Sequence, residues 1–469
     1  MATLIRGTLV HTPSLGEVKI LQDYLLGIDD KGFINFLENA SSDAAQTLLS
    51  ESGAPPTIIP PGSFILPTFC DLHLHAPQFL YQGTGLHLPL MEWLNEYAFK
   101  AEEKIDADPL LARKVYTRLA DRLSENGTGA VLLFGTIKEE TNIILAECMR
   151  QTGIRAFVGK LSMDQCSRPT YVEASASAAI DSVKSFILRC NTLEGHLPLH
   201  QRLIEPVLTP RFVPTCSDEL LSQLGRLSTE NNLRIQSHMA EAHDQVEWVR
   251  QQRNMEDIDV FDKHGLLTPR TIQAHCTFLD QPMFNRVVTR GTAIAHCPLS
   301  NAYFSAEPFP LREALDTGVR VGLGTDIAGG YDVSIMSTMR HAVTVSRMRE
   351  GGRIMADSRE RSKDGREVTN KPLSVDWKEA LYLATRGGAE ALGLQSGVFR
   401  PGAPFDAQQI NIIENTTKLA VGPLDFLDGE NIRILQELSP EAIEKWFCLG
   451  DVRNRIKMWI QGKVVLLKP

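Results

Sequence analysis

The chain has 469 residues, more than one ordinary compact core holds, so we expect one large domain and one small one. Its formal net charge of -9 argues against a polyanionic partner, whether nucleic acid or an anionic membrane. No apolar run reaches the roughly 20 residues that a bilayer requires, and the first residues lack the pattern of an export signal, so we expect a cytoplasmic protein.

The first segment alternates apolar and polar residues between turn signals such as Asp30-Lys31-Gly32, which is typical of antiparallel hairpins. A proline-rich stretch, GAPPTIIPPG, marks the end of this segment. The last segment, with APFDAQQINII and IKMWIQGKVVLL, has the same alternation. We therefore predict that residues 1–63 and 400–469 pair with each other into one small β-sandwich.

Between these ends, residues 64–399 contain eight short runs rich in Val, Ile and Leu, each followed by a helical pattern. Near-continuous apolar strands that alternate with helices indicate a parallel sheet covered on both faces. Eight such units over roughly 260 residues fit a TIM-type (β/α)8 barrel, an α/β fold, better than an open doubly wound sheet. The runs are FILPTFCDLHLH, GTGAVLLFGT, IRAFVGKLSMD, LIEPVLTPRF, LRIQSHMAE, TIQAHCTFL, GTAIAHCPLSN and VRVGLGTDIAGG.

One segment of the barrel region, residues 348–372, is dense in charges of both signs and nearly free of aromatic side chains. Such a composition buries little apolar surface to offset the entropy of ordering, so we predict a charged surface loop after the last barrel strand. A lid over the active face is the alternative.

Two histidines, His73 and His75, end the first barrel run. Side chains at i and i+2 of a strand point to the same face, so both imidazoles can reach one metal ion, although an H-x-H pair alone is a weak signal. Other polar residues also fall at the ends of predicted strands, and in a TIM barrel the carboxyl ends of all strands meet at one mouth. These residues are His238, His275, His296 and Asp326.

Three imidazoles and one carboxylate suit a divalent metal, zinc above all, although iron accepts the same ligands. Such an ion lowers the pKa of a bound water toward roughly 7, which predicts metal-assisted hydrolysis. Glu241 lies three residues after His238, where a carboxyl can shuttle protons; its alternative role is a charge at a helix N-terminus. His275 could orient the water from outside the ligand set, and His296 has either a supporting or a purely structural role.

The strand-end motifs HLH, SHMAE, AHC, AHCPLSN and GLGTDIAGG together resemble the amidohydrolase superfamily, specifically its deaminase and chlorohydrolase branch. The likeness covers nearly the whole chain and implies a homodimer with one zinc ion per chain. The zinc ligands that it implies are His73, His75, His238 and Asp326. The catalytic residues that it implies are Glu241, His275 and Asp326.

Longer stretches are similar to members of that branch that act on guanine, namely LHLHAPQFLYQGTGLHLPLMEWLNEYAFKAE, RAFVGKLSMDQ, LTPRFVPTCSDELL and IQSHMAEAHDQVEWV. The resemblance implies a hydrolysis in which water attacks C2 of guanine, Glu241 protonates the adjacent ring nitrogen and Asp326 passes a proton toward the leaving ammonia, giving xanthine. The substrate-binding residues that it implies are Gln78, Arg211, Phe212, His238, Glu241, His275 and Asp326.

The residue chemistry fits a purine ligand, because an arginine fork and a glutamine amide can hydrogen-bond its carbonyl and ring nitrogens while Phe212 packs on the ring. For Arg211 the alternative is a buried ion pair with a barrel acid. Two other functions stay open: a related hydrolase acting on another purine, pyrimidine or triazine ring, and a noncatalytic scaffold. The zinc deaminases with a P-C-x-x-C motif are excluded because the chain has none, and Lys160 is the one positional candidate for a carboxylated bridge between two metals.

Overall fold

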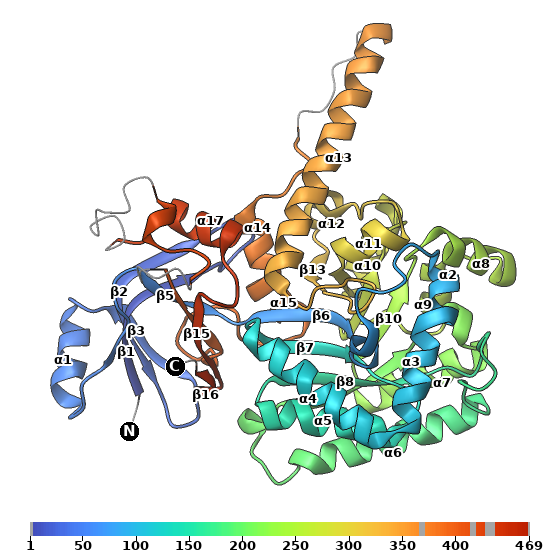
Figure 1. Ribbon diagram of the computed structural model, residues 1–469, viewed down its shortest axis with the longest axis horizontal. Coiled ribbons are helices and arrows are strands. Elements are labelled where there is room, and N and C mark those ends of the chain that lie inside the picture. Colours follow the sequence, from blue (N-terminus) through green and yellow to red (C-terminus); the bar gives the residue numbers. More distant parts are fainter. Residues whose placement is uncertain (1–2, 365–370, 413–418, 427–436, 468–469) are drawn as a thin grey trace.

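The computed structural model describes residues 3–364, 371–412, 419–426 and 437–467. Two sheets organise these residues, and Figure 1 shows them side by side. Both chain termini lie at the sheet on the left of the view, which the two terminal segments form. None of the helices in the described part of the chain combines the length and apolarity that crossing a bilayer requires.

One sheet is a TIM-type barrel of eight parallel strands in the order β13-β12-β11-β10-β9-β8-β7-β6, each in one of the eight predicted runs. Two backbone hydrogen bonds join its edges, from Asp326 N to His73 O at 2.8 Å and from His75 N to Ile327 O at 2.9 Å. The strands are β6 (Phe69–His75), β7 (Thr128–Phe134), β8 (Arg155–Ser162), β9 (Ile204–Pro210), β10 (Ile235–Met239), β11 (Thr271–His275), β12 (Ala293–His296) and β13 (Arg320–Leu323).

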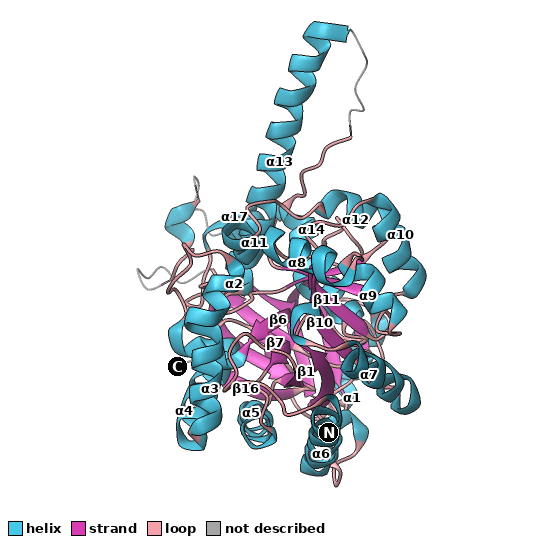
Figure 2. Cartoon of the chain, turned by 90° about the vertical axis from the view of Figure 1, so that its right-hand side faces the viewer, coloured by secondary structure: helices cyan, strands magenta, loops and turns pink. Residues whose placement is uncertain are grey.

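Helices surround these strands, as Figure 2 shows. Their ends follow local sequence signals: α4 starts at Pro109 because the Asp108 side chain accepts hydrogen bonds from two backbone N–H groups of the first turn, and α5 ends at a left-handed Gly153. The main helices are α3 (Phe99–Ala107), α4 (Pro109–Glu125), α5 (Glu139–Thr152), α6 (Ala176–Glu194), α7 (Asp218–Asn231), α8 (His243–Arg253), α9 (Asp257–Lys263), α10 (Gln281–Arg290), α11 (Pro298–Phe304), α12 (Leu311–Thr317) and α13 (Ile335–Asp364). Shorter ones are α2 (Leu90–Trp93), α14 (Trp377–Tyr382) and α15 (Gly388–Ala391).

The terminal segments pair with each other into a second sheet, in the order β16-β15-β14-β5-β1-β2-β3, with β4 beside β1. Strand β5 joins the two ends of the chain because it runs parallel to β1 and antiparallel to β14. It continues past the predicted boundary at residue 63, so the small domain takes part of the first predicted barrel run. The elements are β1 (Thr3–His11), β2 (Lys19–Ile28), β3 (Ile34–Asn39), β4 (Thr57–Ile58), β5 (Ser63–Pro67), β14 (Ala407–Asn411), β15 (Arg455–Ile460), β16 (Lys463–Leu467), α1 (Asp43–Glu51) and α17 (Pro440–Leu449).

The predicted charged loop 348–372 is wrong for most of its length, because α13 continues through it to Asp364. This helix projects away from the barrel (Figures 1 and 2). Charge density bears on burial rather than on backbone conformation, and Arg, Glu, Met and Ala all favour helix. Arg353 also pairs with Glu350 and Asp357, one turn away on either side. Residues 365–370 lie outside the described residues, and the lid role stays a prediction.

A buried ion pair joins the two sheets. Arg155, at the start of β8, donates to Asp406, the residue just before β14. The distances are 2.7 Å from Nε to Oδ2 and 3.0 Å from Nη2 to Oδ1.

We expect Arg155→Met to lower the free energy of unfolding by about 3–5 kcal/mol, because it leaves the Asp406 carboxylate buried without its cation. Denaturant unfolding measures the change. Arg113→Met is the matched control: it removes the exposed pair with Glu147 and should cost under about 1 kcal/mol. Equal costs for the two variants would contradict the expectation.

Candidate active site

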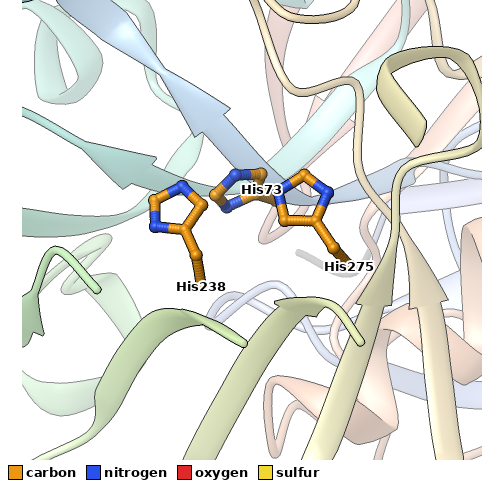
Figure 3. A group of neighbouring side chains, drawn as sticks. All are labelled: His73, His238 and His275. Atoms are coloured by element: carbon orange, nitrogen blue, oxygen red, sulfur yellow. The ribbon is translucent and has the colours of Figure 1, made fainter. Parts of the chain in front are cut away.

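Four histidines and one aspartate predicted for the site meet at the carboxyl ends of the barrel strands. His73 and His75 come from β6, His238 from β10 and His275 from β11, and Asp326 follows β13. Asp326 Oδ1 lies 3.1 Å from His73 Nε2 and 3.7 Å from His75 Nε2, while Oδ2 lies 3.8 Å from His275 Nε2. The Nε2 atoms of His75 and His238 are 2.9 Å apart. Figure 3 shows the imidazoles of His73, His238 and His275 next to one another, with His73 between the other two.

This cluster fits a divalent metal ion. Donor atoms of His73, His75 and Asp326 lie within 4.8 Å of one another, as do those of His73, His238 and His275. The Nε2 atoms of His73 and His275 are buried and have no hydrogen-bond partner, which a bound cation would supply. Burial holds the pKa of His73, His75 and His238 well below the usual range, so these imidazoles are neutral and their lone pairs are free to bind a metal.

A third group of donor atoms within the same distance contains Cys297 with His275 and Asp326. Burial, and then the charge of Asp326, raises the pKa of the Cys297 thiol well above its usual range. This group contains one histidine, whereas the other two contain two and three, and neutral imidazoles bind a metal without first losing a proton, so we favour the histidines and the aspartate as the donor set.

Neighbouring groups hold these side chains in place. His238 Nδ1 donates to the backbone carbonyl of Arg211 at 2.6 Å, and His275 Nδ1 donates to Asn301 Oδ1 at 2.9 Å, so both rings turn Nε2 toward the cluster. Beneath them, Asp71 accepts from the Thr325 hydroxyl at 2.6 Å and ties β6 to the end of β13. Sequence reasoning assigned no role to Asn301 or Asp71, although both lie within the motifs that it singled out.

His275 and His296, which both end predicted barrel strands, differ in their surroundings. His275 belongs to one of the donor groups that could hold a metal and has a left-handed backbone with φ of 69°, a strained conformation of the kind that collects at functional sites. His296 is buried against Phe309, with ring centroids 5.0 Å apart, and among the described residues no group of metal-binding donors includes it. Its packing favours the structural role.

Glu241 lies just beyond β10 and lines a pocket together with Asp326 and His238. Its Oε2 is 3.6 Å from His275 Nε2. Burial, and then the charge of Asp326, raises the pKa of Glu241 well above its usual range. Lys160, in contrast, donates to Glu173 Oε1 at 2.6 Å, and this engaged amine argues against a carboxylated bridge between metals.

The pocket is lined by both polar and apolar side chains. The polar ones include Gln78, Arg211 and Glu241, and the predicted stacking residue Phe212 also lines the pocket. The apolar side chains are Leu90, Trp93, Leu94 and Phe304. Polar groups that can orient a ligand and apolar side chains that can pack on it thus line the same cavity, as is usual for small-molecule sites.

Arg211 was predicted either to bind a ligand or to form a buried ion pair, and its position is compatible with both. Its Nη1 donates to Glu102 Oε2 at 2.5 Å, so it forms a buried ion pair, and its side chain also lines the pocket. Glu102, on α3, is a further residue that sequence reasoning missed. It lies at the end of one of the stretches that carry the family resemblance, but no motif marks it.

Residues 64–465 match the amidohydrolase family. The chain belongs to this family. Among curated relatives, this amidohydrolase is 35% identical to guanine deaminase of Dictyostelium discoideum, over 98% of this chain and 98% of the relative. It is 35% identical to guanine deaminase of Mus musculus, over 99% of this chain and 97% of the relative.

Among solved structures, a guanine deaminase from C. acetobutylicum with bound guanine in the active site resembles this amidohydrolase with a TM-score of 0.83 and 28% identity, over 99% of this chain and all of that chain. A triazine hydrolase from Arthobacter aurescens has a TM-score of 0.78 at 20% identity, over 99% of this chain and 95% of that chain. At that identity the likeness shows the shared fold.

Proposed function

We propose that this amidohydrolase catalyses the hydrolytic deamination of guanine to xanthine and ammonia, a step of purine catabolism. The observation that carries the proposal is the placement of Gln78 and Arg211 in the same pocket as His238, Glu241 and Asp326. Hydrogen-bonding groups for a purine edge thus lie beside groups that suit metal-assisted hydrolysis. The full-length similarity to guanine deaminases supports the same substrate.

For the cofactor we propose one zinc ion per chain, held by His73, His75, His238 and Asp326. Neutral imidazoles with one carboxylate are a usual zinc donor set, and iron is the alternative that elemental analysis of the purified protein distinguishes. When bound, the metal supplies an activated water for attack on the ring carbon that carries the amino group.

The protein's side chains would move the protons, orient the water and bind the purine. Glu241 accepts a proton from the attacking water and returns it to the ring nitrogen beside the reacting carbon. Asp326 passes a proton toward the leaving ammonia. His275, fixed by Asn301, orients the water through Nε2. Arg211 and Gln78 hydrogen-bond the purine, and Phe212 packs on its ring.

A direct assay tests the proposed reaction. Purified protein is expected to convert guanine into xanthine with one ammonia released per turnover, to stop when a chelator removes the metal, and to recover when zinc is restored. Adenine and a triazine serve as competing substrates in the same assay. Deamination of one of these rings with guanine left unchanged would contradict the proposal, and absence of any turnover after zinc addition would favour the noncatalytic scaffold.

The division into domains, the assembly and the location are also proposals. We place the small domain at residues 1–63 and 400–469 and the barrel at 64–399, a boundary that strand β5 of the terminal sheet crosses. We propose a homodimer in the cytoplasm, which rests on the family resemblance. Sedimentation of the purified chain tests the homodimer, and cell fractionation tests the cytoplasmic location.

A further inference from the structure

The carboxylate of Glu102 lies between the two side chains that the proposed function assigns to purine binding. Its side chain is fully buried. Oε1 accepts from Gln78 Nε2 at 3.0 Å, and Oε2 accepts from Arg211 Nη1 at 2.5 Å. Glu102 itself does not line the pocket, whereas Gln78 and Arg211 do. The carboxylate therefore acts on a ligand through these two neighbours.

The contacts of Gln78 fix which way its amide points. Oε1 accepts from the backbone N–H of Ala328 at 3.2 Å, while Nε2 donates to Glu102. A flipped amide would turn its oxygen toward the carboxylate and its NH2 toward the Ala328 N–H, so both contacts would become repulsive. Glu102 and Ala328 therefore define which edge of Gln78 a ligand meets.

The contacts of Arg211 leave one edge of its guanidinium for a ligand. Nη1 is engaged by Glu102, and the guanidinium carbon lies 4.9 Å from the centre of the Phe99 ring. Nη2 is buried and has no hydrogen-bond partner. A buried donor without a partner costs stability unless a ligand supplies an acceptor, and a carbonyl oxygen is such an acceptor.

The negative charge of Glu102 is a second way in which this residue supports the site. Arg211 is a buried cation, and its backbone holds His238, one of the expected metal ligands. Two cations near each other in a medium of low dielectric repel strongly. The negative charge of Glu102 offsets that of Arg211, so that an arginine can serve as a purine-binding donor beside a metal site.

We propose that Glu102 is a positioning residue that sets the substrate selectivity of this site. It holds Arg211 and Gln78 so that their free donor groups face the oxo group of a purine, and the site therefore favours 6-oxopurines over rings that carry hydrogen at C6. This inference rests on the proposed deamination of guanine and adds to it the residue that selects the oxo group.

The test compares guanine with 2-aminopurine, which has the same C2 amino group but no oxo group at C6. In Glu102→Gln the new amide can accept from only one of its two partners, and the charge of Arg211 is no longer offset. We expect kcat/KM for guanine to fall about 100-fold, mainly through KM, and the preference for guanine over 2-aminopurine to fall at least about 10-fold. Where 2-aminopurine is not turned over, its inhibition constant replaces kcat/KM.

Two further variants separate positioning from folding. Glu102→Asp keeps the charge but is one methylene shorter, so the preference is expected to fall in the same direction by about 3-fold or more. Glu103→Gln is the matched control, because the neighbouring glutamate pairs with Arg168 at the surface and should leave the preference unchanged. Metal content is measured for every variant.

The outcomes distinguish this inference from the proposed function. If the unmodified chain deaminates guanine and both Glu102 variants keep its preference for guanine over 2-aminopurine, the positioning role is wrong and the function stands. If the unmodified chain does not act on guanine, the proposed function fails first. A loss of kcat/KM that is equal for both ligands would mean that Glu102 is only structural, and would overturn the inference as well.

Discussion

Glu241→Gln is expected to lower kcat for guanine by about 10³-fold while the metal content of the chain stays unchanged. The side chain lies in the pocket beside His275 and Asp326, where the attacking water and the ring nitrogen would meet. Glutamine has nearly the same shape and can still hydrogen-bond, but it cannot accept a proton and return it. The loss should therefore appear in kcat, with KM changed little.

The measurement is steady-state turnover of guanine together with elemental analysis of the same preparation. Glu247→Gln, on the exposed face of α8, is the matched control and should keep full activity. A Glu241→Gln enzyme that retains more than about a tenth of the original kcat would rule out Glu241 as the proton carrier, because general acid-base catalysis contributes at least about 10²-fold.

His73→Ala is expected to lose both metal and activity. His73 Nε2 lies 3.1 Å from Asp326 Oδ1 and has no hydrogen-bond partner, so its removal takes one of the four proposed ligands from the centre of the cluster. Metal content should fall well below one ion per chain, and turnover of guanine by about 10³-fold or more, because without the metal no activated water forms at neutral pH.

A surface histidine provides the comparison for this variant. His196 is exposed on the loop between α6 and β9, and His196→Ala should keep both metal and turnover. Full metal content in His73→Ala would contradict the assigned ligand set. Taken with Glu241→Gln, which should retain its metal, the variant separates the residues that bind the ion from those that move protons.

The barrel and the cluster of histidines with Asp326 could be predicted because both follow from strand geometry. Fully buried parallel strands give continuous apolar runs, and all their carboxyl ends lie at one mouth. His73 and His75 share a strand face, and His238, His275 and Asp326 each end an apolar run. A local pattern therefore placed residues together that are separated by up to 253 positions in the chain.

The parts that sequence reasoning missed depend on contacts that no local pattern encodes. The charge pattern of residues 348–372 indicated exposure, which is compatible with a helix as well as with a loop, and the ion pairs of Arg353 favour the helix. Glu102 is a carboxylate on a helix, a position that is usually exposed. Its burial becomes visible only when the fold brings α3 against Gln78 and Arg211.

The backbone carbonyl of Arg211 holds His238, whereas the Arg211 side chain faces the pocket. A mutation at this position changes the side chain and leaves the carbonyl in place. A different side chain can therefore line the pocket at this position while the hydrogen bond that orients the His238 ring is kept. On a barrel fold that also occurs in a triazine hydrolase, this separation means that the lining of the pocket can vary while the orientation of the His238 ring is kept.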